Sequence, residues 1–145
     1  MAEAMQTYKN HARFFPPFHF FVLPVLALNA LNEIRHVVQN PSLHTAWMLV
    51  VALALATLAL TARLMALTVQ DRVIRLEMRH RLGQCLPADL QARIGDLTRQ
   101  QLIALRFASD AELADLVRDV LAGNLASSKE IKLRVKNWQG DWLRA

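Results

Sequence analysis

The chain has 145 residues, is 54% hydrophobic and carries a formal net charge of +5. This length accommodates at most one membrane hairpin and one small soluble domain. Cys85 is the only cysteine, which excludes an intramolecular disulfide and a cysteine metal cluster. The chain has only four glycines and contains neither a glycine-rich phosphate loop nor a nucleophile elbow. We therefore predict no enzyme activity, no metal and no cofactor.

A short polar arm, residues 1–17, precedes the first long apolar stretch. The prolines at the end of this arm suit the first turn of a new helix. A helix needs about 20 apolar residues to cross the hydrocarbon core, since each residue rises about 1.5 Å. We predict a first span over residues 18–38, with a kink at Pro24. It shows no small-residue cleavage site, so we expect a retained span and not a signal peptide.

A second apolar stretch predicts a second span over residues 44–66. The turn predicted at residues 39–42 is short, so the two spans would be antiparallel neighbours in a hairpin within residues 18–69. Trp47 suits the membrane interface. No proline or glycine interrupts residues 45–82, which predicts that the second helix leaves the membrane and continues into water.

The basic residues 70–86 predict a juxtamembrane stalk helix. Arginines flank the predicted hairpin on the side away from its turn, which has no Lys or Arg, so the positive-inside rule places both termini in the cytoplasm. Basic charge next to a membrane favours anionic lipid headgroups and makes nucleic acid an unlikely partner. The predicted headgroup contacts are Arg72, Arg75, Arg79, Arg81, Lys129, Lys132, Lys136, Trp138 and Trp142.

Residues 87–145 predict a small cytoplasmic domain of short helices. Its last helix carries an aromatic stripe with Trp138 and Trp142 beside three lysines, and this stripe either contacts lipid or closes the core of the domain. Capping boxes, in which a hydroxyl and a longer side chain exchange bonds with exposed amides, predict three helix starts. The pairs are Thr98 with Gln101, Ser109 with Glu112, and Ser127 with Glu130.

The first span has one polar face, formed by Asn29, Asn32, Glu33 and His36 at helical spacing. Polar groups at membrane depth are costly and normally face protein or a water-filled cavity. One hypothesis is that this face packs on another helix through side-chain hydrogen bonds. The alternative is that it lines a pore or a small-ligand site.

Small residues on one side of the second span predict a packing face, because they let two helices approach closely. Arg63 lies on the same side, and in an antiparallel pair it would be level with His19, as an anchor at the inner interface. The predicted face consists of Ala52, Ala56, Ala59, Arg63 and Ala66.

Two Glu-x-x-His sequences, at residues 33–36 and 77–80, have the spacing found in carboxylate-bridged di-iron bundles. The predicted bilayer separates them, so they would not share a metal pair within one chain. Metal or haem binding, for example at His36 and His44, is the third functional hypothesis.

The sequence has four distinctive segments: Tyr8-Lys9-Asn10-His11, Gln70-Asp71-Arg72, Leu105-Arg106-Phe107-Ala108-Ser109-Asp110, and Lys129-Glu130-Ile131-Lys132 followed by Lys136-Asn137-Trp138. They resemble a family of small bacterial two-span membrane proteins that is a domain of unknown function. The resemblance covers nearly the whole chain and implies a helical cytoplasmic tail, but no activity, cofactor or catalytic residue. Within the third segment, caps and an Arg106–Asp110 bond would fix a joint between two helices.

The sequence thus predicts an all-α fold with an antiparallel two-helix transmembrane hairpin, a long stalk helix and a small helical C-terminal domain. We expect it in the bacterial cytoplasmic (inner) membrane. The predicted function is a membrane-anchored interaction or scaffold protein, or an accessory subunit of a membrane complex. The alternative is a small homo-oligomeric channel or transporter. The predicted partners are anionic lipids and either further copies of the chain or a larger membrane complex.

Overall fold

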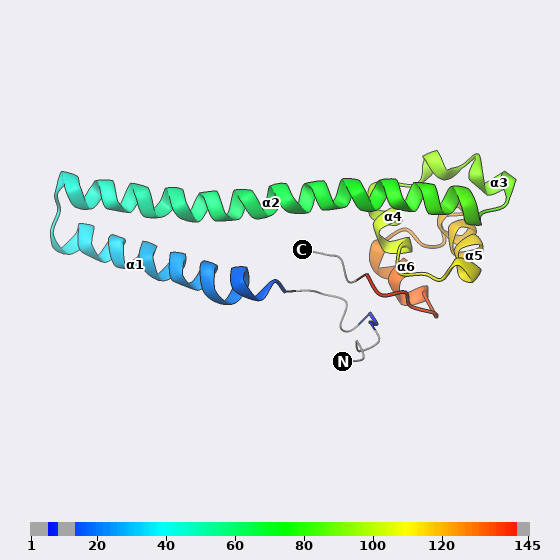
Figure 1. Cartoon of the computed structure of the whole chain (residues 1–145), viewed down its shortest axis with the longest axis horizontal. Helices are drawn as coiled ribbons and strands as arrows, with labels where there is room; N and C mark the ends of the chain where they lie inside the picture. Colours follow the sequence, from blue (N-terminus) through cyan, green and yellow to red (C-terminus); the bar gives the residue numbers. More distant parts are fainter. Residues whose placement is uncertain (1–5, 9–13, 142–145) are drawn as a thin grey trace. The chain divides into compact units, whose positions relative to one another are not determined.

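The computed structural model describes residues 6–8 and 14–141, and within this part of the chain every regular element is a helix. The all-α fold class, with one long helix and several short ones, is confirmed (Figure 1). The chain divides into two compact units, one of residues 14–68 and one of residues 69–141 together with residues 6–8. The antiparallel transmembrane arrangement of the hairpin stays a prediction.

In the first unit, a π-helical segment, η1 (Pro17–Val22), leads directly into α1 (Leu23–Gln39). Pro17 occupies the first helical position, where its missing N–H costs no hydrogen bond. At the junction, the Leu23 N–H donates to the Phe18 carbonyl, five residues back. The change from π to α geometry therefore falls one residue before Pro24, the residue that cannot donate to the helix ladder.

The turn after α1 leads into α2 (Leu43–Cys85), a single helix of 43 residues. Ser42 and Thr45 cap its start reciprocally: the Ser42 hydroxyl accepts from the Thr45 N–H at 3.1 Å, and the Thr45 hydroxyl accepts from the Ser42 N–H at 3.0 Å. The predicted continuation of the second apolar helix far beyond membrane length is confirmed. α2 continues through Gly83 and ends at Cys85, two residues before Pro87, because a proline disfavours the helical conformation of the residue that precedes it.

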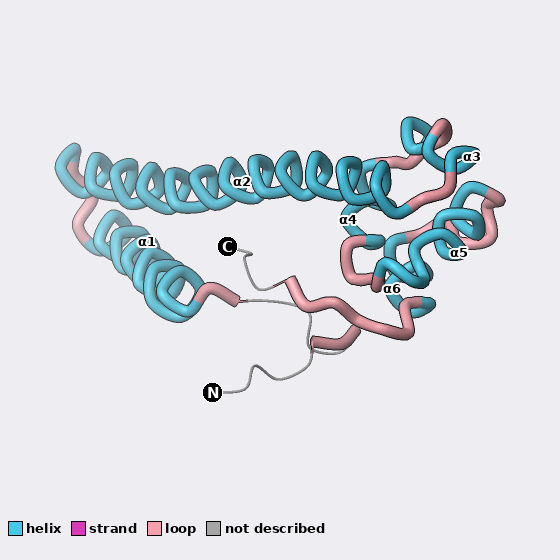
Figure 2. The backbone as a smooth tube through the Cα atoms, turned by 45° about the vertical axis from the view of Figure 1, so that its right-hand side comes forward, coloured by secondary structure: helices cyan, strands magenta, loops and turns pink. Residues whose placement is uncertain are grey.

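The second unit contains the end of α2 and a set of short helices, joined by loops (Figure 2). All three predicted helix starts are confirmed, and the Thr98 and Ser127 capping boxes form both of their hydrogen bonds. At Ser109 the hydroxyl oxygen has no hydrogen-bond partner among the described residues, and the bond to the Glu112 side chain alone forms. The Thr98, Ser109 and Ser127 N–H groups donate to Gln101, Glu112 and Glu130 at 2.8, 3.1 and 3.0 Å. The elements are α3 (Ala88–Gln91), η2 (Ile94–Asp96), α4 (Arg99–Leu105), α5 (Asp110–Leu121) and α6 (Ser128–Arg134).

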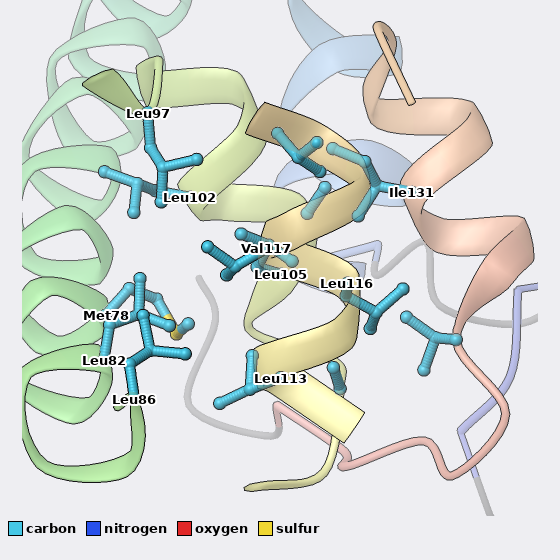
Figure 3. Close-up of a cluster of buried hydrophobic side chains, with 14 of the residues drawn as sticks. Met78, Leu82, Leu86, Leu97, Leu102, Leu105, Leu113, Leu116, Val117 and Ile131 are labelled. Atoms are coloured by element: carbon cyan, nitrogen blue, oxygen red, sulfur yellow. The ribbon is translucent and has the colours of Figure 1, made fainter. Parts of the chain in front are cut away.

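The last turns of α2 supply one wall of the hydrophobic core of this unit (Figure 3). Met78 and Leu82 of this helix, and Leu86 one residue beyond its end, lie at helical spacing and are buried, with Leu82 fully inaccessible. They pack with buried apolar side chains of the segments that follow, a set that includes Leu97, Leu102, Leu105, Leu113, Leu116 and Val117. The basic stalk of the sequence analysis is thus also the core helix of the small domain.

Replacing Leu82 by Ala should destabilise the small domain by about 2–5 kcal/mol, because the substitution leaves a cavity in a closed core. The measurement is limited proteolysis of the full chain in detergent, with cleavage followed within residues 87–141. Leu76→Ala is the matched control, since Leu76 lies on the same helix and is 71% exposed. Equal protease sensitivity of the two variants would contradict the proposed core.

Candidate functional surfaces

The polar face of α1 is divided between covered and exposed positions. Asn29, Asn32 and His36 are exposed, whereas Glu33 is half-buried. The half-buried residues of α1 recur at alternating spacings of three and four, and they are Leu23, Leu26, Ala30, Glu33 and Val37. Glu33 therefore belongs to the covered stripe, and the other three polar residues border that stripe without being covered within this chain.

Four of the five residues of the predicted packing face of α2 are covered in the first unit. Ala52 is buried and Ala56, Ala59 and Arg63 are half-buried, whereas Ala66 is exposed. The Arg63 guanidinium lies 5.8 Å from the centre of the Phe18 ring, one residue from the position expected at its level. Beside this contact, a cleft of about 400 Å³ is lined by Phe15, Phe18 and Val22 and by Ala59, Ala62, Arg63 and Ala66.

Three of the predicted lipid-binding arginines gather on the part of α2 that belongs to the second unit. Arg72, Arg75 and Arg79 line a cleft of about 380 Å³ together with Val69, Val73 and Leu76. All six side chains are exposed. In the part of the chain that the structure describes, none of these three arginines makes an ion pair.

Arg81, the fourth arginine of this group, lies in a different environment and fixes the joint between α4 and α5. Its Nε donates to Asp110 Oδ1 at 2.7 Å. Its Nη1 donates to the Arg106 carbonyl at 3.2 Å, and its Nη2 donates to the Ala108 carbonyl at 2.7 Å and to Gln139 Oε1 at 2.8 Å. One guanidinium therefore ties the end of α2 to the joint and to the C-terminal segment.

This network also changes the expected partners within the joint. Asp110, which the sequence analysis pairs with Arg106, accepts from Arg81, and Arg106 forms an ion pair with Asp141 at 3.0 Å. The hydrogen bond from Arg81 lowers the pKa of the Asp110 carboxyl, and the positive charge of Arg81 acts in the same direction. Burial, followed by the charge of Asp110, raises the pKa of the nearby Cys85 thiol.

An aromatic stack connects the joint to the segment after α6. The Phe107 and Trp138 rings lie 4.8 Å apart between centroids, and the Arg106 guanidinium lies 4.4 Å from the Phe107 centroid. The Lys132 ammonium is 5.6 Å from the same centroid, and the Gln139 N–H donates to the Phe107 carbonyl at 2.8 Å. These contacts favour the alternative in which the aromatic stripe closes the core.

The last helix is shorter than the sequence predicts: α6 ends at Arg134, so Lys129 and Lys132 lie on the helix, and Lys136 and Trp138 lie in the segment after it. Lys129 and Lys136 are exposed, and the Lys136 backbone N–H donates to Glu112 Oε2 at 3.0 Å. Trp142 lies outside the described residues. The third and fourth distinctive segments of the sequence therefore meet in one site, around Phe107 and the carboxylate of Glu112.

The candidate metal ligands do not gather. Among the described residues there is no group of three His, Cys, Asp or Glu side chains that would hold a metal ion. Glu33 and His36 lie in the first unit and Glu77 and His80 in the second.

Arg81 is the residue whose role the sequence analysis missed. Its position on the helix could have revealed this role. Arg81 follows Met78 by three residues and precedes Cys85 by four, so it lies on the side of α2 that faces the core. Counting it with the other stalk arginines by charge alone obscured this placement.

Replacing Arg81 by Lys should destabilise the second unit by about 1–3 kcal/mol, because an ammonium does not reproduce the fork of donors that reaches four acceptors. Thermal unfolding of the full chain in detergent, read by protease resistance of the small domain, measures the loss. Arg79→Lys is the matched control on the same helix. An equal loss of stability in the two variants would contradict a special role of Arg81.

The lowered pKa of Asp110 predicts a pH dependence that Asp110→Asn should abolish. The pKa of the Asp110 carboxyl in the folded state lies below its ordinary value of 3.8. The contribution of Asp110 to stability is therefore present above about pH 5 and is lost as the pH falls through the folded-state pKa. The carboxyl is 61% exposed, so we expect less than about 1 kcal/mol. Unfolding of the two proteins compared at pH 6 and pH 3 tests this, and equal acid sensitivity would contradict it.

Comparisons with known proteins identify a family but no activity. A model of a family of unknown function, DUF6526, matches residues 1–145, which is the whole chain. No curated protein and no solved structure matches the chain. The chain therefore belongs to the DUF6526 family of unknown function.

Proposed function

We propose that this protein is a membrane-anchored scaffold whose two apolar helices cross the bacterial cytoplasmic membrane as an antiparallel hairpin. Two helices, Pro17–Gln39 and Leu43–Cys85, are long and apolar enough to cross a membrane. In their most apolar stretches, 0% and 6% of the residues are buried within the chain. The core helix of a soluble protein would be mostly buried, so this exposure supports lipid as the surrounding medium.

The covered positions of the two helices support a close antiparallel pair. Residue numbers that add up to 82 place Ala56 level with Leu26 and Ala52 level with Ala30, and all four side chains are covered. The Arg63–Phe18 contact agrees with this register to within one residue. At both levels α2 presents an alanine, and small residues let membrane helices pack closely without a hydrophobic driving force.

The observation that carries the scaffold proposal is the exposure of Asn29, Asn32 and His36 on α1. At membrane depth, exposed amides and an imidazole would lack hydrogen-bonding partners in lipid, so this face requires a protein cover. A second copy supplies it with the right chemistry, because an amide both donates and accepts and is therefore complementary to itself across a two-fold axis. The cytoplasmic domain would then present a docking surface in two copies.

A pore formed by several copies is the second candidate function, and the same three exposed side chains favour it. Water in a central channel would satisfy them as a helix partner would. The two functions differ in what the polar groups do. In a scaffold they hold the copies together, whereas in a pore they line a water-filled channel that conducts ions.

Replacing Asn29 and Asn32 by Leu should weaken self-association. Interhelical side-chain bonds contribute about 0.6 kcal/mol each, and at most about 1.7 kcal/mol, so losing several should raise the dimer dissociation constant about tenfold or more. The mass of the protein extracted into native nanodiscs, over a range of protein-to-lipid ratios, measures this. Ala27→Leu is the control, because Ala27 is exposed two residues away, on nearly the opposite side of the helix.

Unchanged association of the double variant would contradict the scaffold. If its assembly persists while ion flux through reconstituted vesicles is lost, the pore is the correct function. If the wild-type protein is monomeric, or co-purifies only with unrelated chains, a different protein covers the polar face of α1. The chain would then be an accessory subunit of a membrane complex.

A further inference from the structure

The cleft of Arg72, Arg75 and Arg79 on α2 combines positive charge with apolar surface, and its side chains take no part in the core of the small domain. Its three arginines make no ion pair within the described residues, and none of its six lining residues belongs to the buried core. Asp71 precedes Arg75 by four residues, a spacing that allows an ion pair on a helix, yet no such pair forms. The three guanidinium groups are thus available to an external anion.

Apolar side chains run beside this basic stripe. Val69, Val73 and Leu76 are 59%, 47% and 71% exposed, although this part of α2 belongs to the helical domain. On a helical projection they form a strip next to the arginines and away from the core side chains Ile74 and Met78. A ligand that satisfies both strips has an anionic head and an apolar tail.

We propose that this cleft binds an anionic phospholipid whose headgroup contains two phosphates, with its acyl chains along Val69, Val73 and Leu76. This inference rests on the membrane placement in the proposed function and names a lipid that the scaffold selects. Arginine binds phosphate through paired N–H donors. From Arg72 to Arg79 the helix advances about 10 Å, which is longer than one phosphate, so two phosphates match the stripe better than one.

The depth of the cleft agrees with a lipid ligand. If Trp47 marks the outer interface, the helix crosses the hydrocarbon core in about 20 residues and leaves it near Leu67. Val69 and Arg72 then lie at the depth of the headgroups. Side chains on a helix lean toward its N-terminus, and in α2 that direction points back to the membrane. Arg75 and Arg79 therefore extend toward the phosphates, and Arg79 shares the cleft with Val69, ten positions earlier.

A second copy of the chain is a poorer occupant of this face. A two-fold contact would oppose the arginine stripe with its own copy, and like charges at short distance are repulsive. Basic pockets beside membrane helices on the cytoplasmic side are typical sites for lipid headgroups with several phosphates.

The test is lipid retention by the full chain, reconstituted in vesicles of phosphatidylcholine with either cardiolipin or phosphatidylglycerol at equal phosphate charge, then extracted and analysed by native mass spectrometry. Wild type should retain cardiolipin at least about tenfold better than phosphatidylglycerol, and the triple Arg72→Gln/Arg75→Gln/Arg79→Gln variant should lose this preference. The control has the same change of charge on three exposed arginines of the same unit: Arg93→Gln, Arg99→Gln and Arg134→Gln.

Three results would overturn the inference: equal retention of both lipids by wild type, an unchanged preference in the triple variant, or equal loss in the control. Displacement of cardiolipin by inorganic phosphate would also overturn it, because the cleft would then bind free phosphate. The oligomer mass is read in the same spectra. Cardiolipin retained on a monomeric protein would contradict the scaffold and support the lipid site. An intact oligomer without lipid selectivity would support the scaffold and contradict the lipid site.

Discussion

The rest of the structure depends on one constraint: α1 and the first half of α2 leave their apolar side chains uncovered. Burial of apolar surface is the main favourable term in folding, so a chain that exposes Phe20, Leu28, Leu58 and Leu64 to this extent needs a medium other than water. In the proposed function a bilayer supplies that medium, and a helical backbone suits it, because helices satisfy their own N–H and C=O groups in lipid. The same medium makes exposed amides costly, which gives Asn29 and Asn32 their significance.

α2 has two different tasks along its 43 residues. Its first half has a covered side of alanines. Its last turns contribute Met78 and Leu82 to the core of a domain that is too small to bury much apolar surface by itself. Arg81 adds a polar contact at the same place, since its guanidinium reaches the joint at Asp110 and the C-terminal segment at Gln139. The helix that carries the apolar stretch is therefore also the one that organises the small domain.

The sequence predicted those features that depend on local pattern. Periodicity and capping chemistry identified the helices and their starts, and small-residue spacing identified the covered side of α2 from Ala52 to Ala59. Tertiary roles were harder, because composition does not say which partner a charged side chain meets. Arg81 and Arg79 are alike as residues, yet one binds the joint and the other is exposed. Likewise, Trp138 stacks on Phe107, a contact that requires the path of the chain between α4 and the end of α6.

Labelling by a membrane-impermeant thiol reagent tests the central claim, the transmembrane hairpin, most directly. In a Cys85→Ser background, one cysteine replaces Asn40 in the turn and another replaces Gly95, where an added side chain meets nothing within 4 Å. A transmembrane hairpin predicts that Asn40→Cys is labelled in intact cells, after removal of any outer barrier, and that Gly95→Cys is labelled only once the cytoplasmic membrane is opened. Labelling of both positions from the same side, or recovery of the protein without membranes, would contradict the account.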